Sequence, residues 1–255
     1  MSDYSRQFAF DEPIVYRSPR GAKETVTVHP VRMRQYSFFM NLAPVLLFDK
    51  NSVPDVEVIS MSYLGYLSKL TREDENVGLI LLHLLRMVLM PDEKDPEKLI
   101  LLMSNDGFQL GGKIFDKQDF DEIRSIIIKQ NLLVPPDETV QKEIRDAIAE
   151  GERIRRKLSG NKTAGIEDQM VAVSVQTGLT LEYIYDMTVR KFIKMIERID
   201  QSMHYKIYLA ASMSGFVTFK DKSVIKHWLA DIRKGKHDGM MELSEFENKL
   251  SGAVE

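Results

Sequence analysis

Residues 77–90 read VGLILLHLLRMVLM, the most apolar stretch of this 255-residue chain. As a helix, the stretch would span about 21 Å, because each helical residue rises about 1.5 Å. A bilayer core is roughly 30 Å thick, and His83 and Arg86 interrupt the apolar run. The stretch therefore predicts a buried helix of a soluble core, in which His83 is a hydrogen-bonded core residue, and not a membrane span.

The composition points to an ordinary globular protein of the cell interior. Hydrophobic residues make up 44% and charged residues 29% of the chain, and its formal net charge is -3. A nearly balanced charge gives no general attraction to nucleic acid or to an anionic membrane. The chain has no cysteine, which excludes disulfides, thiolate nucleophiles and cysteine-ligated zinc. Residues 1–12 lack the basic start and apolar run of a signal peptide.

The first half of the chain predicts helices and a small β element. Apolar residues recur at helical spacing in 33–48, with an interruption at Pro44, and again in 56–70. The β-branched segment 25–31 predicts a short edge strand. In 99–115, Asn105-Asp106-Gly107 lies between two apolar runs and predicts a β-hairpin, because these residues tolerate the positive φ of a tight turn.

Two further signals fall near that hairpin. Gly111-Gly112, inside the second predicted strand, suggests a β-bulge. Asp119-x-x-Glu122 resembles a capping box and predicts the start of a helix that runs to about residue 130.

The segment SGNKTAG, residues 159–165, is the clearest linker, because small and polar residues support little packing. We therefore expect a mainly α fold of helical lobes with a small antiparallel β-hairpin element. The expected parts are an irregular arm (1–23), an N-terminal helical lobe (24–158) with the hairpin near 99–115, the linker (159–165), a compact C-terminal helical lobe (166–234) and a loosely ordered tail (235–255).

The C-terminal lobe is expected to contain helices at 166–176, 181–187, 188–213 and 224–232. Gly178 would end the first of them. The 188–213 helix carries one apolar face and one charged face. On the apolar face, Phe192 and Ile196 lie one turn apart, and we expect both to be buried.

No motif in the chain predicts catalysis. The five histidines have no metal-ligand spacing, and there is neither a phosphate-binding loop nor a G-x-S-x-G nucleophile motif. We therefore expect no catalytic, cofactor-binding or metal-binding residues, and no enzyme. A basic cluster follows the polar helix expected at 138–158. Cations at a helix C-terminus are favourable without any ligand, so nucleic-acid binding is the less favoured interpretation of this cluster. It consists of Arg153, Arg155, Arg156, Lys157 and Lys162.

The segment after Gly215 is the candidate partner-binding site. It reads Phe216-Val217-Thr218-Phe219, and Trp228 follows. Strand-like alternation would place Phe216 and Phe219 on opposite sides, so one small core cannot easily bury both. Exposed aromatic side chains are favoured anchors at protein interfaces, and the fourteen methionines either fill the core or add adaptable apolar surface. Burial of these aromatics inside the lobe is the alternative.

Several phrases resemble the tail assembly chaperones of long-tailed bacteriophages, in the larger form found in phages of Gram-positive hosts. They are SGNKTAGIEDQM at 159–170, TGLTLEYIYDMTVRKFIKMIERID at 177–200, HYKIYLAASMSGFVTFKDKSVIKHW at 204–228, and PPDETVQKEIRDAI at 135–148.

The resemblance implies a non-catalytic protein of the host cell cytoplasm. Such a chaperone binds the phage tape measure protein and tail tube subunits during tail morphogenesis and is absent from the mature virion. A homo-oligomer is possible in this group. One alternative is a structural tail or baseplate component of the virion. A second alternative is a nucleic-acid-binding accessory protein that uses the basic cluster.

Overall fold

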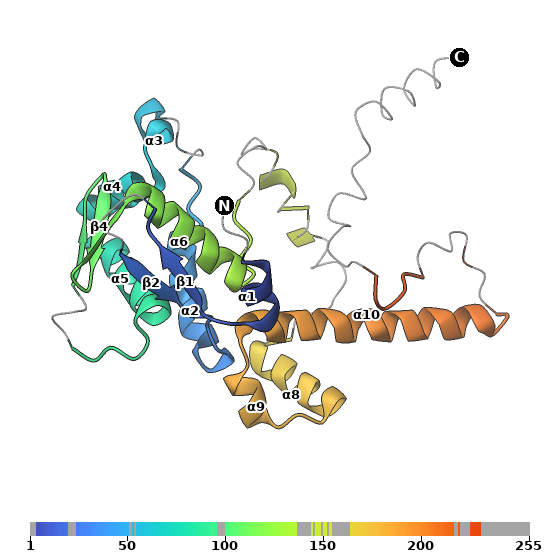
Figure 1. The fold of residues 1–255 in the computed structure, drawn as a ribbon. Coiled ribbons are helices and arrows are strands. Elements are labelled where there is room, and N and C mark those ends of the chain that lie inside the picture. The colour runs from blue at the N-terminus through green and yellow to red at the C-terminus, as the bar shows by residue number, and fades with distance from the viewer. Residues whose placement is uncertain are drawn as a thin grey trace, which may run out of the picture. The chain divides into compact units, whose positions relative to one another are not determined.

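The computed structural model describes residues 4–19, 24–50, 53, 55–95, 100–136, 144, 146–148, 150–151, 153–154, 164–216, 219 and 225–230. The fold is mainly α with two small antiparallel sheets, which confirms the predicted fold class. The chain divides into two compact units, Met1–Phe192 and Ile193–Glu255. The first unit contains every element that precedes α10 in Figure 1.

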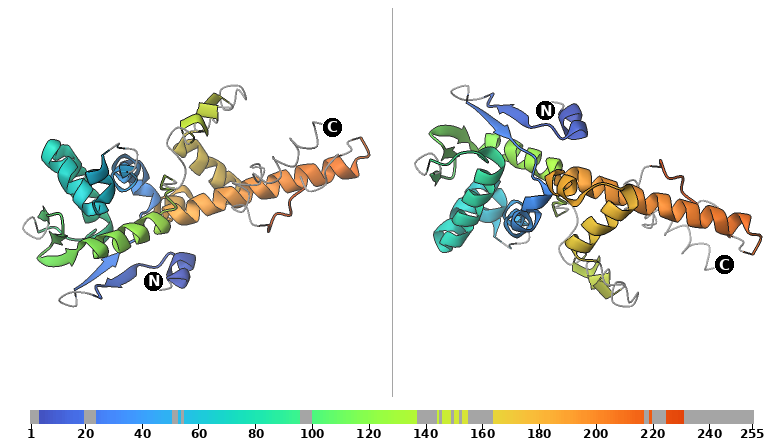
Figure 2. Two further views of the ribbon diagram at one scale, coloured as in Figure 1. Left: turned by 90° about the horizontal axis from the view of Figure 1, so that it is seen from above. Right: turned by 90° about the horizontal axis from the view of Figure 1, so that it is seen from below.

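Residues 4–19 contain a helix and a strand, within the segment 1–23 that we expect from the sequence to be an irregular arm. Helix α1 (Ser5–Phe10) is followed by strand β1 (Ile14–Arg17), which pairs antiparallel with β2 (Thr25–Val28). Along β1, buried Ile14 and Tyr16 alternate with exposed neighbours, the period-two pattern of a strand with one face in a core. The two views of Figure 2 place α6 (green) between this hairpin (blue) and the α4–α5 pair (teal).

A run of short helices follows β2. It consists of the 3-10 helix η1 (Met33–Gln35), α2 (Tyr36–Leu42), η2 (Ala43–Leu46), α3 (Val56–Ser60), α4 (Tyr63–Glu73) and α5 (Glu75–Leu89). Pro44 lies at the start of η2, where its missing N–H costs nothing, so the predicted interruption is confirmed.

The helix predicted over 56–70 is two helices. Ser62 has extended backbone angles and caps α4, because its hydroxyl accepts a hydrogen bond from the Gly65 N–H at 3.0 Å. A single residue, Asp74, separates α4 from α5. It ends α4 and caps α5, because its carboxylate accepts a hydrogen bond from the Asn76 N–H. Gly78 lets α5 approach α4 closely, since a Cβ atom there would lie 2.6 Å from the Thr71 methyl carbon.

Helix α5 contains the apolar stretch and is the buried helix that the sequence predicts. Leu81, Leu84, Leu85 and Val88 are each at most 1% exposed. His83 is exposed, so the expectation of a core histidine is wrong: position 83 lies on the α5 face that points away from these leucines. Among the described helices, none is both long enough and apolar enough to span a bilayer.

The second sheet has three strands in the order β3 (Leu101–Met103), β4 (Gly107–Leu110) and β5 (Lys113–Asp116). The turn at Asn105-Asp106 is where the sequence predicts it. Gly111-Gly112, however, is a second chain reversal and not a bulge. Both glycines have positive φ, 60° and 76°, which is the backbone that a two-residue hairpin turn requires.

Helix α6 (Lys117–Gln130) has its N-cap three residues before the predicted cap at Asp119. Asp116 is the N-cap, and Asp119 is the third helical residue of the capping box, so Glu122 plays no part in it. The predicted end near residue 130 is confirmed.

The carboxylate of Asp119 is 2% exposed and joins α6 to the N-terminal strand. It accepts hydrogen bonds from the Tyr16 hydroxyl at 2.7 Å, the Ser18 hydroxyl at 2.8 Å and the Asp116 N–H at 3.0 Å. A buried carboxylate is tolerated only when its oxygens are hydrogen-bonded in this way.

A second buried cluster fixes α4 against η2 and α6. The Tyr63 hydroxyl donates to the Val45 carbonyl and accepts from the Phe48 N–H, both at 2.9 Å. The Arg124 guanidinium lies 3.7 Å above the Tyr63 ring and donates to the Leu46 carbonyl. Burial raises the pKa of Tyr63 to about 12, because a buried phenolate would lose its solvation.

The C-terminal helices are α8 (Ile166–Thr177), α9 (Leu181–Asp186) and α10 (Val189–Met213). Gly178, with φ 75°, ends α8 as predicted. The chain between α9 and α10 pairs with residues 31–33: the Met33 N–H donates to Met187 O and the Val189 N–H donates to Val31 O, each at 2.8 Å.

The structure divides the chain at a different place from the lobe boundary expected at 159–165. Residues 166–192 belong to the first compact unit, and the division falls inside α10, after Phe192. The pairing of 187–189 with 31–33 provides a physical reason. Residues 155–163 and the tail expected at 235–255 lie outside the described residues.

We expect the Asp119→Ala substitution to lower the free energy of unfolding by on the order of 3 kcal/mol, because two buried hydroxyls lose a charged acceptor. Urea unfolding followed by circular dichroism measures this loss. Asp106→Ala is the matched control: the Asp106 side chain is 87% exposed and pairs only at the surface with Lys117, so its removal should change little. Equal small losses for the two variants would contradict the role of Asp119.

Candidate functional site

The C-terminal unit contains a helix face whose apolar side chains are incompletely covered. Helix α10 has buried residues only at its start, Val189 and Phe192, and Phe192 is 1% exposed as predicted. From residue 196 onward, apolar residues continue at spacings of three or four, which places them on one side of the helix. We name this set the α10 stripe: Ile196, Ile199, Met203, Ile207 and Ala210.

The stripe becomes more exposed toward its C-terminal end. Ile196 and Ile199 are half-buried, which corrects the expectation that Ile196 is fully buried, whereas Met203 is 48% and Ile207 58% exposed. Met213, at the end of the helix, is 78% exposed. An apolar row of this kind is unusual on a protein surface unless it binds something.

The opposite face of α10 is occupied by the chain that follows it. Arg198 donates to the carbonyl oxygens of Trp228 at 2.9 Å and Ala230 at 2.8 Å, and Gln201 donates to the carbonyl of Lys226 at 3.0 Å. Figure 1 shows residues 225–230, in red-orange, beside the middle of the helix. Two tyrosines complete the contact.

These tyrosines form edge-to-face ring pairs. Tyr205 packs on His227 with ring centroids 5.2 Å apart, and Tyr208 packs on Phe219 at 5.8 Å. Since Arg198, Gln201, Tyr205 and Tyr208 lie on the helix side opposite the α10 stripe, the returning segment binds one face and leaves the other face open within the described residues.

The three predicted partner-binding residues are in different environments. Phe216 is 95% exposed, Phe219 is half-buried against Tyr208, and Trp228 is 43% exposed beside His227. The helix expected at 224–232 is absent from its described part, 225–230, which contains a turn at Trp228. The physical reason is that its carbonyl groups accept from Arg198 and Gln201 instead of from helical N–H groups.

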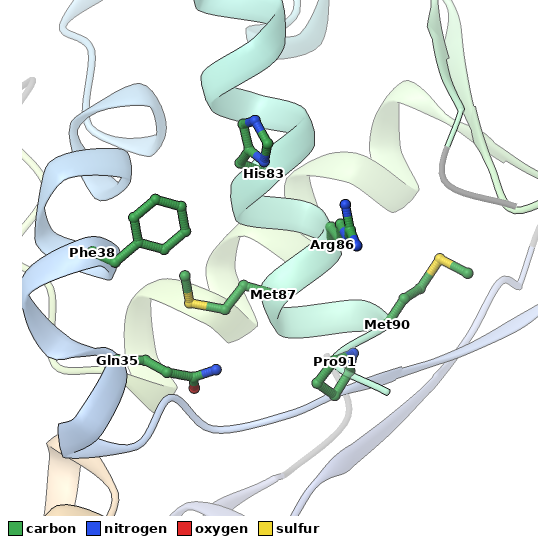
Figure 3. Close-up of a pocket in the computed structure, with 7 residues that line it drawn as sticks. All are labelled: Gln35, Phe38, His83, Arg86, Met87, Met90 and Pro91. Carbon is green, nitrogen blue, oxygen red and sulfur yellow. The ribbon is translucent and has the colours of Figure 1, made fainter. Parts of the chain in front are cut away.

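A shallow groove of about 220 Å³ lies between α2 and the end of α5 in the first unit (Figure 3). One side is lined by His83, Arg86 and Met87 of α5 and by Met90, which caps the helix, at the spacing of one helix face. Phe38 faces His83 across the groove, with ring centroids 6.4 Å apart. Gln35 and Pro91 complete the lining. The groove is open and its lining mixes polar and apolar side chains, and we assign it no chemistry.

The titratable groups with shifted pKa values do not gather at one place. Burial lowers the pKa of His29 and raises those of Tyr63, Tyr66 and Asp121, and in each case burial is the largest cause. Packing alone produces shifts of this kind. In the described part of the chain, no group of three or more His, Asp or Glu side chains could hold a metal ion.

Of the predicted basic cluster, only Arg153 lies within the described residues. It forms an ion pair with Glu150 at 2.8 Å, one helical turn away. Arg155, Arg156, Lys157 and Lys162 lie outside the described residues.

The contact between Arg198 and the returning segment can be tested with the single tryptophan of the chain. We expect Arg198→Ala to increase acrylamide quenching of Trp228 and to shift its emission to longer wavelength, because two carbonyl groups next to the indole lose their donor. Lys206→Ala, an exposed position on the same helix, serves as the control. If both variants matched the wild-type emission, residues 225–230 would not depend on Arg198.

Comparison with known protein families matches the C-terminal part of the chain. Residues 159–233 match the model of a family described as the YomV second domain. No curated protein and no solved structure matches the chain. The matched range begins at the first residue of the predicted linker and contains α8, α9 and all of α10 with its stripe. This part of the chain is therefore similar to a domain family of bacteriophage origin.

Proposed function

We propose that this chain is a phage tail assembly chaperone, a non-catalytic protein that binds the tape measure protein and tail tube subunits in the host cytoplasm. The observation that carries the proposal is the α10 stripe, a row of accessible apolar side chains inside the segment that is similar to a phage domain family. The resemblance of 135–148, 159–170, 177–200 and 204–228 to such chaperones supplies the specific role.

The stripe has the properties that a chaperone surface needs. A helical client has its own apolar face, and two such faces pack through residues spaced three and four apart. Met203 and Met213 are both exposed, and methionine adapts its shape to differing partners. A client bound through such a surface can also be released when tail subunits compete for it, since no covalent step is involved.

Phe216 extends the apolar surface beyond the end of α10. Its ring is 95% exposed, and a large rigid side chain of this kind is a favoured anchor when a partner encloses it. We place Phe216 in the binding surface together with the stripe. Phe219 and Trp228 instead hold the returning segment on the helix: the Phe219 ring contacts Tyr208, and the Trp228 carbonyl accepts from Arg198.

Co-expression with the tape measure protein of the same phage tests the proposal. Wild-type chain should keep that protein soluble and co-purify with it. Ile207→Asp places a charge on the stripe and should reduce the recovered complex at least about tenfold, because burying an unpaired charge is costly. Ser212→Asp adds the same charge on the opposite side of the helix, at an exposed position, and should retain the complex.

Circular dichroism of both variants must show wild-type helix content, so that a loss of binding is not a loss of folding. If folded Ile207→Asp rescued the tape measure protein as well as wild type, the stripe would not be the binding surface. If wild type itself gave no rescue, the chaperone assignment would fail.

Mass spectrometry of purified virions separates the chaperone from a structural tail component. We expect the chain to be depleted from mature particles and abundant in lysates of infected cells before assembly ends. Stoichiometric recovery with the tail would favour the structural alternative.

A further inference from the structure

The outer edge of β3, in the first unit, carries backbone groups that are free to pair. β3 is an edge strand of the order β3-β4-β5. In an antiparallel ladder, hydrogen-bonded and non-hydrogen-bonded residue pairs alternate. The Ser104 N–H donates to Gly107 O at 2.9 Å, so Leu102 with Gln109 is the next hydrogen-bonded pair toward the strand start.

The turn between β4 and β5 predicts the same alternation of hydrogen-bonded and non-hydrogen-bonded pairs. A two-residue turn at Gly111-Gly112 requires Leu110 and Lys113 to be a hydrogen-bonded pair, so Leu110 and Phe108 direct their backbone groups to β5. The N–H and C=O groups of Leu101 and Met103 therefore face the outer edge of the sheet. Within the described residues, no backbone hydrogen bond reaches them from that side.

A hollow lies beyond this edge, so the edge is not covered by packed side chains. It has a volume of about 360 Å³ and lies between β3 and the α4–α5 hairpin. Its lining is largely apolar: Leu79, which is 53% exposed, Leu82, and the strand residues Leu101 to Met103. Arg72 and Glu75 contribute one charge of each sign, so the hollow favours a neutral occupant.

The outer face of the same sheet is also apolar. Leu102 and Ile114 are 58% and 66% exposed, and both are aligned with Gln109 across the strands. A polypeptide that extended the sheet would thus meet apolar side chains on both of its faces.

We propose that β3 is a docking edge for an extended segment of a partner polypeptide, which adds to the sheet as a fourth strand and places alternate apolar side chains in the hollow. The free groups of Leu101 and Met103 select an extended backbone, because a helix has already paired its own N–H and C=O groups. The site lies in the first unit and does not depend on the α10 stripe or on the chaperone assignment.

The occupant is a partner segment and not a second copy of this chain. A symmetric β3–β3 pair would bring the α4–α5 hairpin of each copy under the edge of the other copy. Both hairpins would lie on the same side of the joined sheet. The added strand of each copy would have to fill the hollow of the other copy, where the hairpin of its own copy would also have to fit. A single extended segment carries no such hairpin.

The test uses the full-length, isotope-labelled chain and short synthetic peptides that alternate valine and threonine, blocked at both ends. At saturating peptide, we expect the amide hydrogens of Leu101 and Met103 to exchange with solvent at least about tenfold more slowly, as two new hydrogen bonds would require. Matched peptides that are N-methylated at alternate positions cannot donate to one edge. One of the two methylation registers should bind at least about tenfold more weakly than the other.

Substitution at Met103 supplies the matched control. Met103→Pro removes the outward N–H but leaves the Leu102–Gln109 pair intact, and proline is tolerated where a strand N–H faces outward. This variant should lose peptide binding, whereas Met103→Ala should retain most of it. Retention of binding by folded Met103→Pro, or no slowing of either amide by any alternating peptide up to about 1 mM, would overturn the proposal. Slowing that rises with protein concentration without peptide would show pairing of two copies instead.

Discussion

The buried carboxylate of Asp119 is the constraint on which the first unit depends. It lies in the first turn of α6, where the helix dipole and the free N–H groups favour an acid. Its other contacts come from Tyr16 and Ser18, about a hundred positions earlier in the chain. A carboxylate at 2% exposure is stable only with these donors, so the N-terminal strand and α6 require each other.

The same principle recurs where other segments meet. Asn131, 1% exposed after the end of α6, accepts from the Val31 N–H and donates to the Ile127 carbonyl. Val31 in turn offers its carbonyl to the Val189 N–H at the start of α10. Residues 31–33 are thus bonded on one side to the end of α6 and on the other to the α9–α10 junction. Buried polar groups with single, specific partners fix which segments lie together, whereas apolar packing alone would allow alternatives.

Sequence patterns identified the elements whose signals are local. The helix at 77–90, the turn at Asn105-Asp106, the end of α8 at Gly178 and the burial of Phe192 all follow from spacing or turn chemistry within a few residues. The strand at 14–17 could not be predicted in this way, because its stability depends on β2 and on Asp119. The sequence pattern predicts that Asp119 is the N-cap of the helix, whereas the N-cap is Asp116 and Asp119 is a buried acceptor. The two roles look alike in sequence, because both require an acid at a helix start.

The candidate surface was only partly predictable. The spacing that places Phe192 and Ile196 on one face of the predicted helix continues to Ile207 and Ala210, so the sequence is sufficient to predict the length of the stripe. Its exposure was not, since that depends on which face the returning segment occupies. For the aromatic residues at 216–228, the sequence suggests more shared exposure than the structure has. They look like one cluster in sequence, but only Phe216 remains almost fully exposed, and Phe219 rests on Tyr208.

Helix α10 explains why an amphipathic pattern can indicate either a core or an interface. Helix α10 is amphipathic because apolar residues lie on one side and polar or aromatic residues on the other. The second set consists of Arg198, Gln201, Tyr205 and Tyr208. An ordinary surface helix buries its apolar side and exposes its polar side. In α10, side chains on the polar side donate hydrogen bonds to backbone carbonyl groups of the returning segment. Such contacts need no apolar partner. Within the described residues the apolar side is therefore left uncovered, and under the proposed function the free energy of covering it is available to a client chain.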